Sequence, residues 1–294
     1  MEYIVGIDIG GTNIRAALLN NEREVLEKFK APNEASRGPE YNLDKLINYI
    51  NENWKSKGIR GIGVGCPGAL NIKDGKILVS PNLKSWEGFN VKEYIAKNTN
   101  IRTELNNDAN VAGLAEARVG VAKNSESVFY ITVSTGVGGA LILDNKIING
   151  FNSAAGEICN LIINEDKHSH SGLVQGGLEG QCSGPNISRI VSEKLGKELD
   201  TPEVFKLYNE GNEEIINIID EICENLSKGI SNIIAVVDPQ VVVLGGSVIL
   251  YNRNLLDIIT KKVKEKVINK ESVDIRIAEI GDDAGLRGAG FLIE

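Results

Sequence analysis

Several features are scarce in this sequence of 294 residues, and each absence argues against a class of protein. The four cysteines, Cys66, Cys159, Cys182 and Cys223, form no C-x-x-C pair, so we expect reduced thiols rather than a disulfide framework. No apolar run reaches the length that crosses a bilayer, and the chain does not open on a basic segment followed by an apolar one. The sequence therefore predicts a cytoplasmic protein with no membrane partner.

Positive charge is also in deficit. The chain has 32 Lys and Arg residues against 40 Asp and Glu, a net charge of −8. Nucleic acids are bound chiefly through clustered Lys and Arg, so we expect no nucleic-acid partner. A hydrophobic content of 42% is typical of a globular protein, and the length suits one large or two medium domains.

The opening stretch is the most informative part of the chain. An apolar strand from Val5 runs into a Gly-Gly-Thr turn, and a second apolar strand returns to Leu19. Backbone N–H groups in such a turn can bind a phosphate, a threonine and an arginine add a hydroxyl and a charge, and an aspartate can hold hydrated magnesium. These candidate residues are Asp8, Gly10, Gly11, Thr12 and Arg15. An ordinary hairpin with a Gly-Gly turn is the alternative.

A second glycine pattern is misleading. Gly63-x-Gly65-x-x-Gly68 matches the dinucleotide-binding fingerprint, which has meaning only when a helix follows. Residues 69–79 instead read as strand, Asp-Gly turn and strand, and Pro67 removes a backbone donor. We therefore reject a nicotinamide cofactor.

A polar run follows the short strand predicted over residues 102–105. It reads Asn106-Asn107-Asp108-Ala109-Asn110 and leads into a helix over 111–118, so Asp108 falls near a strand-to-helix junction. Functional residues of α/β sheets gather at such carboxyl ends of strands. A helix-capping aspartate with no catalytic role is the alternative.

The strand–turn–strand pattern of the opening stretch recurs in the middle of the chain. A strand over 128–133 precedes a glycine-rich turn over 134–139, which contains Thr135 and Gly136, and a strand returns over 140–143. The repeat predicts an α/β fold of two related domains, each presenting a phosphate-binding turn toward a common cleft. Two unrelated hairpins that share glycine turns are the alternative.

The remaining segments complete the predicted domains. We expect a polar loop over 153–184, helices over 187–195, 215–234 and 255–267, a strand over 275–280 and a terminal helix from 284. A buried strand over 241–244 ends in Gly245-Gly246, which suits close approach to a flat ring. The boundaries we predict are 1–117 with 284–294 for the first domain and 118–283 for the second.

Taken together, these motifs resemble the ROK family of sugar kinases, in the actin/hexokinase-like (ribonuclease H-like) ATPase superfamily. The matching motifs are Asp8-Ile9-Gly10-Gly11-Thr12 with Arg15, Gly65-x-Pro67-Gly68, Asn107-Asp108-Ala109-Asn110, Ser134-Thr135-Gly136-x-Gly138-Gly139, Gly156-Glu157, Leu178-Glu179 and Leu244-Gly245-Gly246. They span nearly the whole chain in the family's order.

The resemblance implies a role for each matching residue. Asp108 would be the general base that takes the proton of the sugar's 6-hydroxyl, and Gly68, Asn107, Glu157 and Glu179 would bind other sugar hydroxyls. Gly10, Gly11, Thr12 and Arg15 would face one end of the triphosphate, Thr135 and Gly136 the other, and Gly245-Gly246 the adenosine. The implied cofactors are ATP and Mg²⁺, and the implied assembly is a homodimer.

The sequence departs from the family where a structural zinc site is common. Asn160 stands where the family's His belongs in Gly156-Glu157-Ile158-Cys159-Asn160, and glycine occupies two of three Cys positions in residues 170–177. Zinc prefers four N or S ligands, so we predict that the site is lost and no zinc is bound. An unrelated site built from His168, His170, Cys159 and Cys182 is the alternative. Asn160 would still hydrogen-bond near the sugar.

The overall likeness is closest to bacterial N-acetylmannosamine kinases, with glucokinase second. Three other classes of protein share parts of this pattern. Sugar-responsive repressors of the family carry a helix-turn-helix before the opening motif, and here few residues precede Asp8. An actin-like filament protein would not need Asn107-Asp108 beside Glu157 and Glu179, and an intact Asp108 argues against a sugar-sensing pseudokinase. We predict an ATP-dependent kinase of the sugar 6-hydroxyl.

Overall fold

The computed structural model describes residues 2–169 and 172–294. These residues form two compact units. The first contains the chain up to Lys123, Ala140–Ala155 and Ile280–Glu294, and the second contains Asn124–Gly139 and Gly156–Glu279. The predicted boundaries, 1–117 with 284–294 and 118–283, remain a proposal about functional domains.

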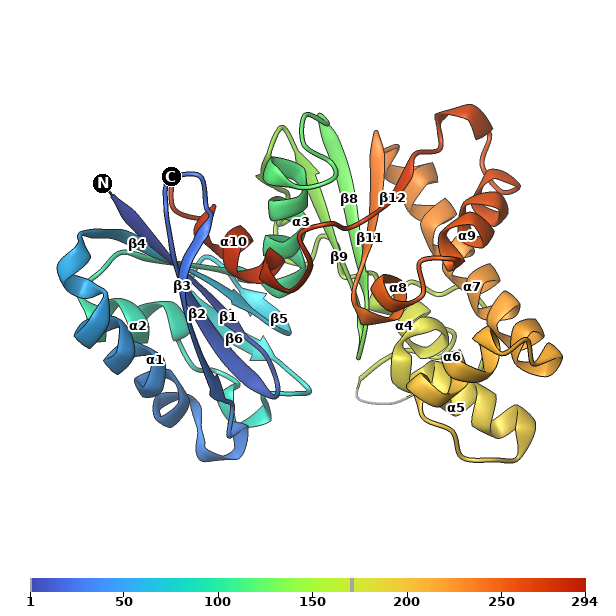
Figure 1. Cartoon of the computed structure of the whole chain (residues 1–294), viewed down its shortest axis with the longest axis horizontal. Helices are drawn as coiled ribbons and strands as arrows, with labels where there is room; N and C mark the ends of the chain where they lie inside the picture. Colours follow the sequence, from blue (N-terminus) through green and yellow to red (C-terminus); the bar gives the residue numbers. More distant parts are fainter. Residues whose placement is uncertain (1, 170–171) are drawn as a thin grey trace. The chain divides into compact units, whose positions relative to one another are not determined.

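The first unit is built on a five-stranded sheet of order β3-β2-β1-β4-β7 (Figure 1). Its strands are β1 (Tyr3–Ile9), β2 (Asn13–Leu19), β3 (Val25–Pro32), β4 (Ile59–Cys66) and β7 (Thr103–Asn107). β1 pairs antiparallel with β2, and β2 with β3, whereas β4 lies parallel to both β1 and β7. The small hairpin of β5 (Ala69–Asn71) and β6 (Lys76–Val79) follows β4.

The second five-stranded sheet repeats this arrangement, with the order β10-β9-β8-β11-β12. Its strands are β8 (Ser127–Val133), β9 (Val137–Leu143), β10 (Lys146–Ile147), β11 (Val241–Gly245) and β12 (Ile275–Ile277). β8 pairs parallel with β11, and β11 with β12, as β1 and β4 do in the first sheet. In both sheets the strand before the glycine turn is central. The predicted repeat is therefore confirmed in the topology.

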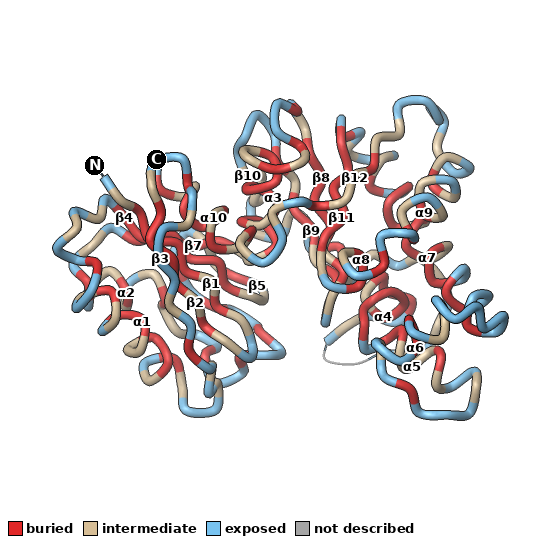
Figure 2. The backbone as a smooth tube through the Cα atoms, in the orientation of Figure 1, coloured by how far each residue is buried: buried red, intermediate tan, exposed pale blue. Residues whose placement is uncertain are grey.

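Helices cover one face of the first sheet with apolar side chains. α1 (Pro39–Asn53) begins with proline at its first position, where the missing N–H costs nothing, and α2 (Val91–Thr99) is capped by Asn90. α1 buries Leu43, Leu46, Ile47 and Ile50 in one cluster with the sheet residues Val5, Ile7, Val64 and Leu105. Figure 2 shows the strands that carry these residues, β1, β4 and β7, as largely buried.

The opposite face of the first sheet carries α3 (Asp108–Val119) and the terminal helix α10 (Ala284–Gly290). A Cβ on Gly6 would lie 2.0 Å from the Leu286 carbonyl oxygen, and one on Gly63 would lie 1.7 Å from that of Ala289. Glycine is therefore required for the helix backbone to rest on β1 and β4. This packing explains part of the false dinucleotide fingerprint: Gly63 accommodates a helix of the protein itself.

The second unit contains six α-helices among its described residues. They are α4 (Leu178–Cys182), α5 (Gly184–Leu195), α6 (Thr201–Asn209), α7 (Glu213–Val237), α8 (Ser247–Tyr251) and α9 (Leu255–Lys264). α7 buries an isoleucine-rich stripe, as its spacing predicted. None of the described helices combines the length and apolarity that a bilayer crossing requires.

Four expectations were wrong in detail. β9 begins at Val137, so the turn is shorter than predicted; α9 ends at Lys264, β12 ends at Ile277, and the expected loop over 153–184 contains α4. α6 was missed altogether, although Asp200 and Glu203 form a capping box at its start, with a proline in its first turn. That signature was present in the sequence.

Candidate functional site

The candidate residues divide between the two units, and each group is described within its own unit. In the first unit, the turn between β1 and β2 leaves Gly11 and Thr12 exposed. Asn33 holds this turn, because its side-chain Nδ2 donates to the Gly10 carbonyl at 2.6 Å and its backbone N–H donates to the Thr12 carbonyl at 2.8 Å. This clamp was not predicted from the sequence, since it depends on the pairing of β2 with β3.

Asp8 and Arg15 face each other across the same hairpin. They are register partners in the β1–β2 pair, and Arg15 Nε donates to Asp8 Oδ2 at 3.1 Å while a second guanidinium nitrogen also binds that oxygen. Asp8 is partly exposed, with 14% of its side-chain surface accessible. The ion pair holds a carboxylate and a guanidinium beside the exposed turn.

Asn107 and Asp108 lie where β7 runs directly into α3. Asn107 is the helix cap, since its Oδ1 accepts from the N–H of Ala109 at 2.9 Å and of Asn110 at 3.4 Å. Asp108 is the first helical residue and also accepts from Ala109 N, at 2.8 Å. The suggestion that Asp108 caps the helix is therefore wrong, because that position belongs to Asn107.

Three parallel strands bring these groups to one edge of the sheet. Asp8 is the register partner of Gly65, and Cys66 that of Asn107, so β1, β4 and β7 end side by side. Cys66 is fully buried there; burial, and then the negative charges of Asp108 and Asp8, raise the pKa of its thiol well above the usual value. The thiol is therefore expected to stay protonated.

Gly68 lies against the same edge. Its φ of +100° favours glycine, and a Cβ would lie 2.4 Å from the Val79 carbonyl oxygen. Asn107 Nδ2 donates to the Gly68 carbonyl at 3.2 Å, which connects two of the predicted sugar-binding residues. Asn106 Oδ1 accepts a hydrogen bond from the Asn107 backbone N–H at 2.8 Å. Asp8, Gly68, Asn107 and Asp108 thus form one continuous group in the first unit.

In the second unit, the turn between β8 and β9 is held by Glu179. Its Oε2 accepts the Val137 N–H at 2.9 Å, and a Cβ on Gly136 would lie 2.8 Å from the same oxygen. The Gly184 N–H donates to the Ser134 carbonyl at 2.7 Å, so α5 also anchors the turn. Thr135, at the tip, is exposed. The structure therefore places in contact the turn and the carboxylate that the sequence predicts to bind the sugar.

Glu157 is near Glu179 in this unit. Desolvation raises the pKa of Glu157, the negative charge of Glu179 adds to the effect, and a contact with Cys159 opposes it. The same surroundings raise the pKa of the Cys159 thiol to about 11. Two carboxylates that repel each other favour a ligand whose hydroxyls donate hydrogen bonds to both.

Gly245 ends β11 beside β8, and Gly246 follows as the residue that precedes α8. A Cβ on Gly245 would lie 2.4 Å from the Tyr130 hydroxyl oxygen, and one on Gly246, whose φ is +84°, would lie 2.3 Å from the Val133 carbonyl oxygen. Internal packing alone is therefore enough to require both glycines. Contact with an adenosine remains a proposal.

Asn160, at the position of the family's zinc-binding His, and Cys182, a member of the alternative site, both have other partners. Asn160 Oδ1 accepts the Val174 N–H at 3.0 Å, and Cys182 is buried, its sulfur 3.8 Å from the Ile222 carbonyl oxygen. The predicted alternative included His170, which lies outside the described residues. Among those described, no three His, Cys, Asp or Glu side chains gather as a metal site. An amide whose oxygen already accepts a backbone hydrogen bond does not fit zinc.

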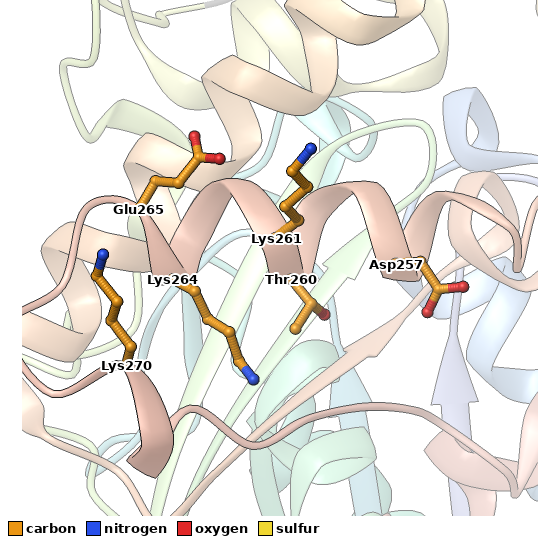
Figure 3. Close-up of a pocket in the computed structure, with 6 residues that line it drawn as sticks. All are labelled: Asp257, Thr260, Lys261, Lys264, Glu265 and Lys270. Carbon is orange, nitrogen blue, oxygen red and sulfur yellow. The ribbon is translucent and has the colours of Figure 1, made fainter.

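A surface pocket on the second unit contains none of the predicted residues. It lies along α9 and the following 3₁₀ turn (Lys270–Ser272), and Figure 3 shows its side chains. The lining residues are Asp257, Thr260, Lys261, Lys264, Glu265 and Lys270. This mixture of charges is typical of the solvated face of an amphipathic helix.

Comparison with known sequences gives a consistent assignment. The sequence model of the ROK family matches residues 4–294. A glucokinase from Halalkalibacterium halodurans is 28% identical, in an alignment that covers 99% of this chain and 95% of that protein. An N-acetyl-D-glucosamine kinase from Photobacterium profundum is also 28% identical, with 98% of each chain covered.

Solved structures show the same fold. A ROK hexokinase from Thermus thermophilus has a TM-score of 0.90 and 29% identity, covering 99% of this chain and 97% of its own. A ROK family glucokinase from Streptomyces griseus, solved with glucose and AMPPNP, has a TM-score of 0.84 over 99% of both chains. At 23% identity, this second likeness concerns the fold alone.

Proposed function

The chain belongs to the ROK family, and from that premise we propose that it is an ATP-dependent kinase of the 6-hydroxyl of a hexose or N-acylhexosamine. The observation that carries this proposal is the edge formed by β1, β4 and β7. Asp108, the first residue of α3, follows β7 at this edge, and the exposed Gly-Gly-Thr turn follows β1 there. Phosphoryl transfer needs mainly such positioning and charge stabilisation.

Asp108 would act as the general base. Its carboxylate would accept the proton of the 6-hydroxyl as that oxygen forms a bond to the γ-phosphorus, while the bond from phosphorus to the ADP oxygen breaks. Asn107 supports this role in two ways, since it caps α3 and binds the Gly68 carbonyl. A positioned base of this kind contributes roughly 10²–10⁴-fold to the rate.

The first-unit turn would bind phosphate. Gly11 and Thr12 are exposed, and the Asn33 clamp fixes the backbone around them. Bound ATP would supply the transferable phosphoryl group, and Mg²⁺ would neutralise part of its charge. Asp8 offers the oxygen ligand that Mg²⁺ prefers, with Arg15 paired to it. Thr135 and Gly136 would face the other end of the triphosphate, and Gly245-Gly246 the adenosine.

The sugar would be bound by acceptors and donors from both units. Gly68 and Asn107 belong to the first, and Glu157, Asn160 and Glu179 to the second. We further propose that the two domains close over sugar and ATP, which would keep water from the phosphoryl group, and that the chain works as a homodimer.

We propose N-acetylmannosamine as the preferred sugar, with glucose as the second candidate. The first choice rests on overall sequence likeness and on Asn160 in place of His; the glucokinase relative supports the second. The test is an ATP-coupled assay with N-acetylmannosamine, N-acetylglucosamine, glucose and mannose. We expect the highest kcat/KM with N-acetylmannosamine. A value tenfold higher for glucose, about 1.4 kcal/mol in transition-state binding, would identify a glucokinase instead.

Metal content gives a separate test of the predicted zinc loss. Protein purified without chelators should contain much less than one zinc per chain. Stoichiometric zinc would contradict this prediction and return His168 and His170 to consideration as ligands.

A further inference from the structure

A long loop separates two of the predicted sugar-binding groups in the second unit. Glu157 and Asn160 precede the loop, in and beside the 3₁₀ turn Ile158–Asn160, and Glu179 follows it on α4. We call the described residues 161–169 and 172–177 the connecting loop. Backbone bonds from Leu178 N to the Leu161 carbonyl, at 2.9 Å, and from Ile163 N to the Gly176 carbonyl, also 2.9 Å, close its base.

Gln181 is the buried centre of a polar network beyond that base. Only 4% of its surface is exposed. Its Nε2 donates to Asp166 Oδ2 at 2.6 Å, and its Oε1 accepts from Asn164 Nδ2 at 2.9 Å. Both ends of one side chain on α4 are therefore bonded to the connecting loop, two residues beyond Glu179.

Asp166 extends the network. Its Oδ1 accepts the His168 backbone N–H at 3.1 Å, and Arg189 of α5 approaches its Oδ2 at 3.4 Å. The Asp166 N–H in turn donates to Asn164 Oδ1 at 3.1 Å. A single carboxylate thus links the loop to two helices, α4 and α5. A hydrogen bond to a charged group is worth more than a neutral one, and a buried network holds its members in one arrangement.

The start of the loop is held in a similar way. Asn160 Oδ1 accepts the Val174 N–H at 3.0 Å, so the side chain that replaces the family's His binds the far arm of the loop. Gly177, at one of the family's Cys positions, leaves little room: a Cβ there would lie 3.1 Å from the carbonyl oxygens of Cys159 and Val174. These contacts do not fit a zinc centre. They join the segment of Asn160 to the segment of Val174 and Gly177, and these are the two segments that the family's zinc site would join.

We propose that Gln181 is a positioning residue, which with Asp166 and the Asn160–Val174 bond holds Glu157 and Asn160 in place relative to Glu179, so that hydrogen bonds replace a metal cross-link. The proposal rests on the proposed function in that Glu157, Asn160 and Glu179 bind the sugar. Because Gln181 bonds at both ends, no side chain with a donor or an acceptor alone can substitute for it.

The test compares two glutamines of the same segment. Gln181→Met keeps length and packing but removes both bonds; Gln175→Met makes the same change at an exposed position. For Gln181→Met we expect the sugar KM to rise about tenfold with kcat changed less than threefold, since a misplaced sugar contact costs this much. Hydrogen exchange of peptides within 157–177 should be faster, with peptides of the first unit unchanged. Gln175→Met should behave as wild type.

A second pair separates a specific bond from general loss of structure. Asp166→Asn keeps one oxygen acceptor, which can receive the Gln181 amide, but loses the second acceptor that the His168 N–H uses, so the sugar KM should rise less than in Asp166→Ala. Asp166→Ala removes the acceptor and should match Gln181→Met in both KM and exchange. Equal defects in the Asn and Ala variants would overturn the proposal.

A metal control completes the test. Protein treated with EDTA and returned to Mg²⁺ buffer should keep its sugar KM and its exchange pattern. A defect after EDTA that Zn²⁺ repairs and Mg²⁺ does not would overturn the proposal, as would faster exchange in Gln181→Met with an unchanged sugar KM. If wild-type protein phosphorylates none of the sugars, the proposed function fails; unchanged exchange in Gln181→Met would refute the network separately.

Discussion

The two glycine turns occupy equivalent places in the two sheets, yet different side chains hold them. The neutral amide of Asn33 clamps the Gly10–Thr12 turn of the first unit, next to the Asp8–Arg15 pair. In the second unit, the carboxylate of Glu179 binds the Val137 N–H of the Ser134–Gly136 turn. The side chain that clamps the first turn is therefore uncharged, whereas the side chain that clamps the second turn is an anion.

This difference in charge suggests that the two turns contribute differently to ATP binding and to sugar binding. The neutral clamp adds no negative charge to the first turn, and the neighbouring Asp8 carboxylate is paired with Arg15, which suits phosphate. The second turn is connected through Glu179 to the proposed sugar site, so we infer that changes there affect sugar binding as well as ATP. One sequence motif thus has two different surroundings, and the following substitutions distinguish them.

The largest expected effect is at Asp108. Asp108→Asn keeps size and most hydrogen bonds but removes the basic oxygen, so kcat should fall by roughly 10²–10⁴-fold with sugar affinity changed far less. Since Asn107 caps α3, the melting temperature should stay close to that of wild type. Steady-state kinetics, sugar titration calorimetry and thermal melting check these three expectations. Retention of more than a tenth of wild-type kcat would refute the role as base.

The second prediction compares the glycines of the two turns. Gly136→Ala places a Cβ 2.8 Å from Glu179 Oε2 and should displace that carboxylate, raising the sugar KM about 10- to 100-fold. Gly11→Ala places its Cβ 3.3 Å from Asn82 Cβ, which a small shift relieves, so the sugar KM should change little while the ATP KM rises. Equal effects of both variants on the sugar KM would remove the distinction between the turns.

A third, smaller effect concerns the clamp of the first turn. Asn33→Ala removes the bond to the Gly10 carbonyl, worth about 1 kcal/mol, so we expect the ATP KM to rise about fivefold. The sugar KM should remain unchanged, because the hydrogen bonds of Asn33 described above go to Gly10 and Thr12 of the phosphate turn and to none of the proposed sugar residues. Kinetics with each substrate varied in turn provides the measurement. A larger rise for sugar than for ATP would be inconsistent with a phosphate turn.

The smallest effect is one of stability and depends on pH. The pKa of Glu157 is raised in the folded protein, so folding favours its protonated form, and the ionised form costs stability as the pH rises above the ordinary value of about 4.5. Glu157→Gln should therefore raise the melting temperature slightly at pH 7, and the gain should vanish near pH 4. Melting curves at the two pH values are the measurement. A lower melting temperature for the variant at pH 7 would contradict the sign.

The sequence predicted the repeated strand–turn–strand units, because alternating apolar runs around Gly-Gly turns depend only on local pattern. It also placed Asp108 at the junction of β7 and α3. It could not show that Gly63 accommodates α10, since that contact joins residues far apart in the chain. For the same reason the partners of Asn33 and Gln181 were missed: each is an ordinary polar side chain whose role appears only after folding.

The central claim is that this chain transfers phosphate to a sugar's 6-hydroxyl with Asp108 as the base. The most direct measurement is phosphorus NMR of the product formed from ATP, Mg²⁺ and N-acetylmannosamine or glucose, by wild type and by Asp108→Asn under matched conditions. We predict a single 6-phosphate product with wild type and almost none with the variant, although the variant still binds the sugar. Phosphate on another hydroxyl, or equal product from both proteins, would contradict the claim.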